Sequence, residues 1–216
     1  MFAGDMSSIL RSLILSAPAI LFALTIHELA HGWVAWRLGD PTAKMMGRLT
    51  LNPLKHLDPI GTIALFLFRF GWAKPVPINP SYFRNPNRDM ALSALAGPGA
   101  NLLTAAAAGL LLRVMHLTGI GINEFPAMIL QYFVMFNIIL CFFNLIPIPP
   151  LDGSRLVYYF LPPDLAAKYS GLERYGFMIL IGVIFLGRFA GVSIIGLYLF
   201  PLVRVFSYIF AGYPII

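Results

Sequence analysis

An apolar run from residue 9 to residue 36 constrains this chain more than any other feature. A helix needs about 20 apolar residues to cross a bilayer, so we expect a membrane-spanning helix here. A glutamate and two histidines lie together within the run, namely Glu28, His27 and His31 in the sequence HELAH. Ionisable side chains at membrane depth are costly and usually functional, so we expect them to form part of a site.

The spacing of these side chains points to metal chemistry. His27 and His31 are four residues apart, so on a helix they share one face and lie about 6 Å apart along its axis. Two imidazoles so placed can bind one Zn²⁺, with Glu28 as general base on a water at the metal. The alternative is a structural group of core histidines and a hydrogen-bonded glutamate, which apolar neighbours would leave without partners. We therefore predict a zinc hydrolase with its active site within the bilayer.

The composition supports a membrane location. Of the 216 residues, 59% are hydrophobic and 11% are charged, whereas a soluble domain carries about 25% charged residues. We expect an all-α polytopic membrane protein with a single domain, 1–216, because no segment is long and polar enough to form a separate soluble domain. The net charge of +6 is scattered among the apolar segments. Membrane topology explains it better than a nucleic-acid partner, which we do not expect.

The hydropathy pattern predicts about five transmembrane helices. The fourth apolar segment is shorter than the others, so it barely spans a bilayer. The five segments are 9–36, 90–112, 127–146, 172–186 and 190–210.

The region between the first two spans, 37–89, has a different character. Residues 44–52 resemble a short strand, and residues 74–80 should be extended because their prolines exclude a helix. Residues 60–68 are apolar but too short to cross the membrane. We expect a re-entrant or interfacial element there, in a re-entrant/β-loop region that other parts of the protein cover.

Charge asymmetry predicts the orientation. The region 37–89 holds eight lysine or arginine residues and the loop 113–126 holds one. The positive-inside rule places 37–89 in the cytoplasm and the N-terminus outside. We expect a multi-pass protein of the cell membrane, with HELAH near the cytoplasmic end of its span and the third span ending on the same side.

Asp152 is the candidate for a third metal ligand. A catalytic zinc site uses three protein ligands and a water position. Asp152 follows the third span, in the sequence NLIPIPPLDG from Asn144 to Gly153, where the prolines end the helix. It could instead cap a helix that begins near Gly153. The topology places it on the side of His27 and His31, which favours the ligand.

Three motifs in order carry a family resemblance. They are HELAH, the sequence GPGAN from Gly97 to Asn101, and NLIPIPPLDG, which matches the pattern N-x-x-P-x-P-x-x-D-G. Together they resemble the site-2 protease family of intramembrane zinc metalloproteases. The resemblance implies that His27, His31 and Asp152 bind one Zn²⁺ and that Glu28 activates the water.

The resemblance also implies an architecture and a substrate. We expect a compact member without PDZ or CBS domains. Its catalytic core, 9–156, would hold three helices and the re-entrant/β-loop 37–89, and 157–216 would form C-terminal helices. The partners would be the lipid bilayer and a transmembrane protein or peptide, cut within or near its membrane segment close to the cytoplasmic side. No feature of the sequence indicates an oligomeric state.

Several residues keep two interpretations. Asn101 could bind substrate or the developing oxyanion, or could serve helix packing beside small residues. Asn144 could bind substrate backbone or satisfy carbonyls that the prolines free. His56 could support the site or be an ordinary loop histidine, and 75–80 could be an edge strand or a rigid connector. The alternative function is a non-proteolytic zinc-binding membrane protein, either a metal carrier or a helix-binding pseudoprotease.

Overall fold

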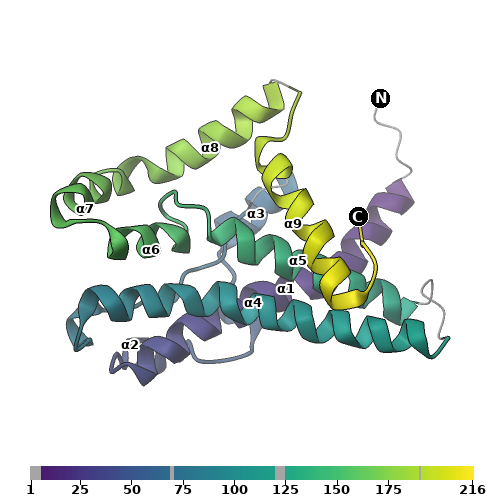
Figure 1. Ribbon diagram of the computed structural model, residues 1–216, viewed down its shortest axis with the longest axis horizontal. Coiled ribbons are helices and arrows are strands. Elements are labelled where there is room, and N and C mark those ends of the chain that lie inside the picture. The colour runs from purple at the N-terminus through teal and green to yellow at the C-terminus, as the bar shows by residue number, and fades with distance from the viewer. Residues whose placement is uncertain (1–5, 69–70, 120–124, 190) are drawn as a thin grey trace.

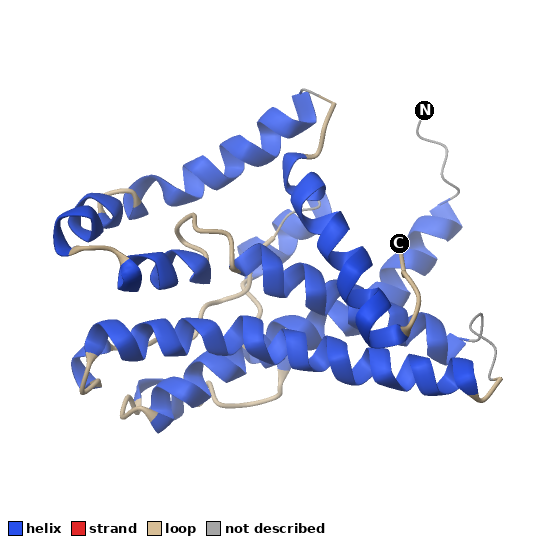
Figure 2. Cartoon of the chain, in the orientation of Figure 1, coloured by secondary structure: helices blue, strands red, loops and turns tan. Residues whose placement is uncertain are grey.

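The computed structural model describes residues 6–68, 71–119, 125–189 and 191–216, and helices dominate this part of the chain (Figure 2). The long helices are α1 (Met6–Arg37), α4 (Pro86–Leu117), α5 (Phe125–Asn144), α8 (Glu173–Phe189) and α9 (Ile194–Ala211). Shorter helices are α2 (Thr42–Met45), α3 (Pro59–Phe68), α6 (Asp152–Phe160) and α7 (Pro163–Ser170), and 3₁₀ turns cover Pro53–Lys55 and Pro80–Tyr82.

Four of these helices are long and apolar enough to cross a membrane: α1 from Ile14 onward, α4, α5 and α9. The helices α7 and α8 make a possible fifth span, with a 64° bend between them. The prediction of an all-α polytopic membrane protein is confirmed. The predicted span 172–186 corresponds to α8. The last helix begins at Ile194, and residue 190, the predicted start, lies outside the described residues.

Small side chains allow the long helices to pack closely. The helices α1, α4 and α5 pack against one another, and α9 packs against α4 and α5 (Figure 1). Ala105 and Ala108 of α4 are buried in this core with Val134 of α5 and Val203 of α9. A Cβ atom on Gly109 would lie 2.5 Å from Cβ of Phe210, so a glycine lets α9 approach α4. Close packing of small residues is a main source of helix association in membranes.

A second group of helices extends from this core. In Figure 1 the chain leaves α5, forms α6 beside α4, turns through α7, and returns along α8 to α9. The helix α6 packs against α4, and α8 packs against α9. We call residues 163–189, which form α7 and α8, the α7–α8 arm. We call residues 145–151, which join α5 to α6, the aspartate loop.

The region between α1 and α4 differs in part from the prediction. Residues 44–52 were expected to form a strand, and this is wrong: they hold the end of α2 followed by turns. Asp40 accepts a hydrogen bond from the backbone N–H of Thr42, and Gly47 has a φ of 64°, which interrupts an extended chain. Residues 74–79 are free of helix, as predicted, and an isolated antiparallel bridge joins Leu57 to Ala73. At ten residues, α3 is about 15 Å long and too short to cross a bilayer.

Candidate metal centre

The two histidines of HELAH lie on one face of α1, as their spacing predicts. Both side chains are buried, and their Nε2 atoms are 3.0 Å apart. Their rings meet edge to face, with the centroids 4.5 Å apart. The helix therefore points two imidazole nitrogens at one place.

The neighbouring helix α4 fixes the orientation of both rings. Nδ1 of His31 lies 2.7 Å from the backbone oxygen of Ser93, and Nδ1 of His27 lies 2.6 Å from Oδ1 of Asn101. A Cβ atom on Gly97 would lie 2.4 Å from Nε2 of His31 and 2.7 Å from Cε1 of His27. A residue without a side chain at position 97 thus leaves room for the rings.

These contacts determine where the imidazole protons are. A carbonyl oxygen is an acceptor, so Nδ1 of His31 carries a proton and donates it to Ser93. Nδ2 of Asn101 donates to the carbonyl of Ala23 and to Oδ1 of Asn137, so Oδ1 of Asn101 must accept from His27. In the neutral rings, each Nε2 therefore presents a lone pair.

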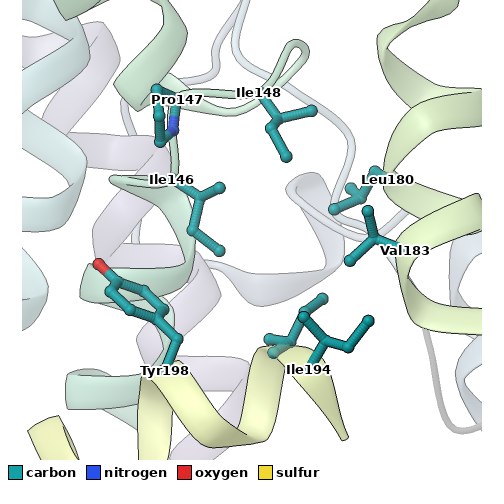
Figure 3. Close-up of a pocket in the computed structure, with 8 residues that line it drawn as sticks. Ile146, Pro147, Ile148, Leu180, Val183, Ile194 and Tyr198 are labelled. Carbon is teal, nitrogen blue, oxygen red and sulfur yellow. The ribbon is translucent and has the colours of Figure 1, made fainter. Parts of the chain in front are cut away.

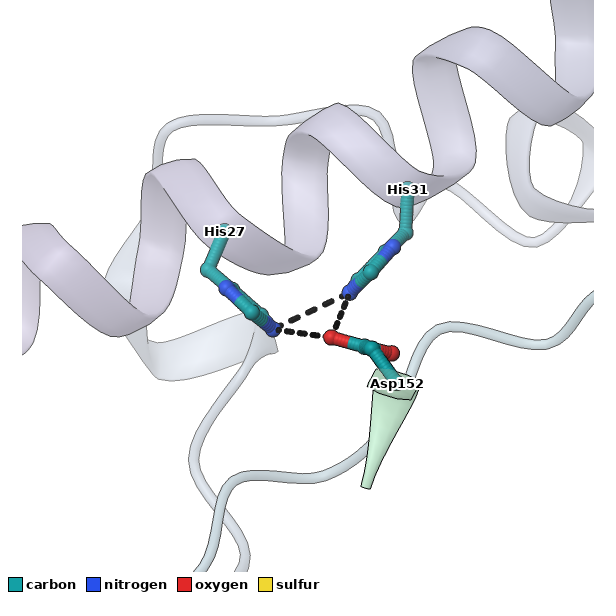
Figure 4. A group of neighbouring side chains, drawn as sticks. All are labelled: His27, His31 and Asp152. Carbon is teal, nitrogen blue, oxygen red and sulfur yellow. Dashed lines mark hydrogen bonds and ion pairs between the residues drawn. The ribbon is translucent and has the colours of Figure 1, made fainter. Parts of the chain in front are cut away.

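Asp152 brings a third acceptor to the same place. Its Oδ2 lies 3.2 Å from Nε2 of His27 and 3.2 Å from Nε2 of His31 (Figure 4). Asp152 is the first residue of α6, and the N-cap position belongs to Leu151. The carboxylate points toward the two histidines (Figure 4).

The donor set fits a metal ion. Oδ2 of Asp152 is buried and has no hydrogen-bond partner among the described residues. Three lone-pair atoms so close together repel one another unless a cation lies between them. In a tetrahedral zinc site with ligand distances of about 2.0–2.2 Å, ligand atoms lie about 3.3–3.6 Å apart. The observed separations are a few tenths of an ångström shorter. The three ligand atoms would therefore need to move apart only slightly to hold a Zn²⁺ ion.

Glu28 lines the same cavity as the two histidines and Asp152. Its Oε2 accepts a hydrogen bond of 2.8 Å from the backbone N–H of Val76. Val76 is buried, and a Cβ atom on Gly32 would lie 2.9 Å from Cγ1 of Val76. The extended segment 74–79 thus lies directly over α1 and contacts the glutamate through its backbone.

Two buried charged residues hold this segment. Arg48 donates from Nη2 to the carbonyl of Lys74 at 2.7 Å and from Nη1 to that of Pro75 at 3.3 Å. Asp40 is fully buried and accepts a hydrogen bond of 2.7 Å from the backbone N–H of Asn79. The segment is therefore fixed near both of its ends.

A cavity of about 300 Å³ joins these groups. It is lined by both histidines, Glu28 and Asp152, by the 74–79 segment through Pro75, Val76 and Ile78, by Met90 and Ala94 of α4, and by Asn144, Pro150 and Arg155. Polar and apolar groups share the lining, as expected for a site that admits both water and a peptide.

The other residues singled out in the sequence lie in different places. Asn101 is fully buried and both N–H groups of its amide are used, so in this conformation it has no donor left for a substrate. Asn144 lines the cavity and donates to the carbonyl of Leu140. His56 is buried in the loop region, where its Nε2 lies 2.9 Å from the carbonyl oxygen of Thr50.

Comparison with known proteins identifies the family. A family model described as peptidase family M50 matches residues 118–187. YwhC of Bacillus subtilis, named as a candidate zinc metalloprotease, is 43% identical over 166 residues, which cover 75% of this chain and 76% of YwhC. The chain belongs to peptidase family M50. This membership confirms the resemblance to the site-2 proteases that the three motifs indicate.

More distant relatives agree with this assignment. Rip2 of Mycolicibacterium smegmatis, also named as a candidate zinc metalloprotease, is 30% identical over 166 residues, or 74% of this chain and 62% of Rip2. Rip2 of Mycobacterium tuberculosis is 30% identical over 172 residues, or 77% of this chain and 64% of that protein. This chain thus spans less than two thirds of the Rip2 proteins. No solved structure matches it.

Sequence reasoning did not identify two of the groups in contact with the site. Ser93 acts through its backbone carbonyl and Val76 through its backbone N–H, so no side-chain motif marks them. The prolines around Val76 were a partial signal, because they predicted an extended segment there.

Proposed function

We propose that this protein is a zinc metalloendopeptidase that cuts a peptide bond within or near the transmembrane segment of a membrane protein. His27, His31 and Asp152 would bind one Zn²⁺, and Glu28 would act as the general base. The observation that carries the proposal is the convergence of three lone-pair atoms at 3.0–3.2 Å beside a glutamate. The whole chain, 1–216, would form one membrane-embedded peptidase domain.

The residues around the metal would have separate roles in hydrolysis. Zinc, when bound, lowers the pKa of water toward ~7 and polarises the scissile carbonyl. The carboxylate of Glu28 takes up the proton of the attacking water and delivers it to the leaving amine. The N–H of Val76 holds one oxygen of Glu28 and leaves the other for proton transfer. Asn101 holds His27 in the tautomer that offers Nε2 to the metal.

The substrate would reach this site as unwound backbone. A transmembrane helix uses its amides internally, so its peptide bonds must be exposed before hydrolysis, and Gly or Pro near the cut would help. Asn144 lines the cavity, which supports a role for it in binding such a backbone. The excess of basic residues in 37–89 supports cleavage close to the cytoplasmic side.

The test is the variant Glu28→Gln. It keeps the side-chain volume and all three metal ligands but removes the base, so zinc content should stay at one per chain while cleavage falls by about 10²- to 10⁴-fold. Membrane proteomics of cells with wild-type or Glu28→Gln protein should show single-pass fragments that accumulate in the variant. If purified Glu28→Gln protein cuts such a substrate at the wild-type rate, the assigned mechanism is wrong.

A further inference from the structure

The aspartate loop contacts the α7–α8 arm at two points. The hydroxyl of Tyr169 on α7 donates a hydrogen bond of 3.0 Å to the carbonyl of Pro147. A Cβ atom on Gly176 of α8 would lie 2.2 Å from the carbonyl oxygen of Pro149. That distance is far below van der Waals contact, so the loop backbone rests directly on the helix backbone and a glycine allows it.

An ion pair adds a third link between the arm and α6. Nη1 of Arg155, three residues after Asp152, lies 2.7 Å from Oε1 of Glu173 at the start of α8. The side chains are 44% and 45% exposed, so the pair contributes little to stability. It does place the first turn of α8 beside the first turn of α6.

Hydrogen bonds inside the loop join the N–H of Ile148 to the carbonyl of Ile146 and the N–H of Leu151 to that of Ile148. The start of α6 also packs on the loop, since a Cβ atom on Gly153 would lie 2.2 Å from the carbonyl oxygen of Leu145. Pro147, Pro149 and Pro150 have no backbone N–H, so in this stretch the chain offers mainly carbonyl groups for hydrogen bonds. Behind the loop lies an apolar cavity of about 300 Å³. Ile146 and Ile148 line it from the loop (Figure 3).

The arm forms the opposite wall of this cavity. Leu180 and Val183 of α8 face the loop across the cavity, and Tyr198 of α9 lines it from below (Figure 3). Continuous packing therefore does not hold the loop against α8 there. Against the arm, the loop is held by the contacts at Tyr169 and Gly176.

The same turn of α8 also contacts the chain just before the 74–79 segment. The ring of Phe177 packs edge to face on Trp72, with centroids 5.6 Å apart. Trp72 lies shortly before the 74–79 segment, whose Val76 holds Glu28. One turn of α8 thus contacts both the loop that leads to Asp152 and the segment that leads to Val76, the hydrogen-bond partner of Glu28.

From these contacts we propose that the α7–α8 arm positions Asp152 in the metal centre, with Gly176 and Tyr169 as positioning residues. This inference rests on the proposed function, since it requires Asp152 to be a metal ligand. It assigns the C-terminal helices a direct part in the site, because displacement of the arm displaces the loop and withdraws the third ligand.

Two glycines of α8 provide a matched test. Gly176→Ala places a methyl group against the carbonyl of Pro149, whereas a Cβ atom on Gly182 of the same helix meets nothing within 4 Å. Both changes raise helix propensity equally. In the purified full chain in detergent, Gly176→Ala should weaken Zn²⁺ affinity about 10- to 100-fold, the range for changes that disturb the support of a metal ligand. Gly182→Ala should bind Zn²⁺ like the wild type.

The readouts are Zn²⁺ affinity by chelator competition and the visible absorption of the Co²⁺-substituted protein. The absorption bands should shift in Gly176→Ala and stay unchanged in Gly182→Ala, because they report ligand geometry. Tyr169→Phe removes one hydroxyl and should weaken Zn²⁺ binding about fivefold, the value of one hydrogen bond. If Gly176→Ala fails to fold, the Zn²⁺ affinity of Tyr169→Phe alone tests whether the arm positions Asp152.

The outcomes separate the two proposals. If wild-type protein binds no Zn²⁺, the proposed function itself fails. If wild-type protein binds Zn²⁺ while Tyr169→Phe and a folded Gly176→Ala have wild-type affinity and spectra, the metal centre stands and the role of the arm is overturned.

Discussion

The two halves of the candidate site are built by different means. His27 and His31 lie on one long helix, and each ring donates a hydrogen bond from Nδ1 to an oxygen of α4. Asp152 follows a proline-rich loop beside an apolar cavity. The histidine half is therefore held by hydrogen bonds to a neighbouring helix, whereas we infer that the aspartate half depends on the contacts of its loop with the α7–α8 arm. A site with one rigid and one adjustable half can keep its metal and still allow a wall to move for substrate.

Removal of a ligand from either half should have the largest effect. His31→Ala and Asp152→Ala each leave two of the three protein ligands, so both should lose stoichiometric zinc. Elemental analysis of the purified chains measures this. The control is His116→Ala, because His116 is exposed and contacts Tyr213 at the C-terminal end of the chain. Full zinc in Asp152→Ala would show that the aspartate half is not part of the metal centre.

The support of the histidine half gives the next prediction. Asn101→Ala removes the acceptor for His27 and should weaken Zn²⁺ affinity about 10- to 100-fold. Thr104→Ala, one turn further along α4, removes a hydroxyl that bonds to the carbonyl of Ala100 and serves as the control. Chelator competition distinguishes them. Equal affinity in the two variants would mean that α1 alone orients His27.

The contact between Val76 and Glu28 should affect turnover more than metal binding. Val76→Pro removes the N–H that holds the carboxylate, and loss of a hydrogen bond to a charged group should lower kcat about tenfold. Val76→Ala keeps the N–H and reveals the effect of the lost side chain. Steady-state cleavage of a transmembrane peptide measures both, with zinc content determined in parallel. The role assigned to this N–H is contradicted if both variants lose the same activity.

The exposed ion pair of the aspartate half should have the smallest effect. Glu173→Gln breaks the contact with Arg155, and exposed pairs contribute at most about 1 kcal/mol, so Zn²⁺ affinity should fall less than about fivefold. The same measurement in 1 M salt should reduce the difference from wild type, because salt screens exposed charges. A larger loss would mean that the arm acts on the loop mainly through this pair.

Much of the fold could be predicted because membrane helices are specified locally. About 20 apolar residues in a row are sufficient for a span, so the segments 90–112 and 127–146 fall on α4 and α5. The strand predicted over 44–52 failed because turn contacts from Asp40 and the positive φ of Gly47 override the extended pattern. The short fourth span became a bent pair of helices, which no hydropathy window can describe.

The sequence by itself determined the residue types of the candidate site. The four-residue spacing of two histidines, the glutamate between them and the family motifs depend on local geometry and residue type. The tertiary structure decided how these groups are held: that Asn101 binds His27, that a backbone N–H binds Glu28, and that the α7–α8 arm contacts the aspartate loop. These contacts join residues far apart in the chain, and they depend on the relative position of packed helices, which a pattern of residue types does not specify.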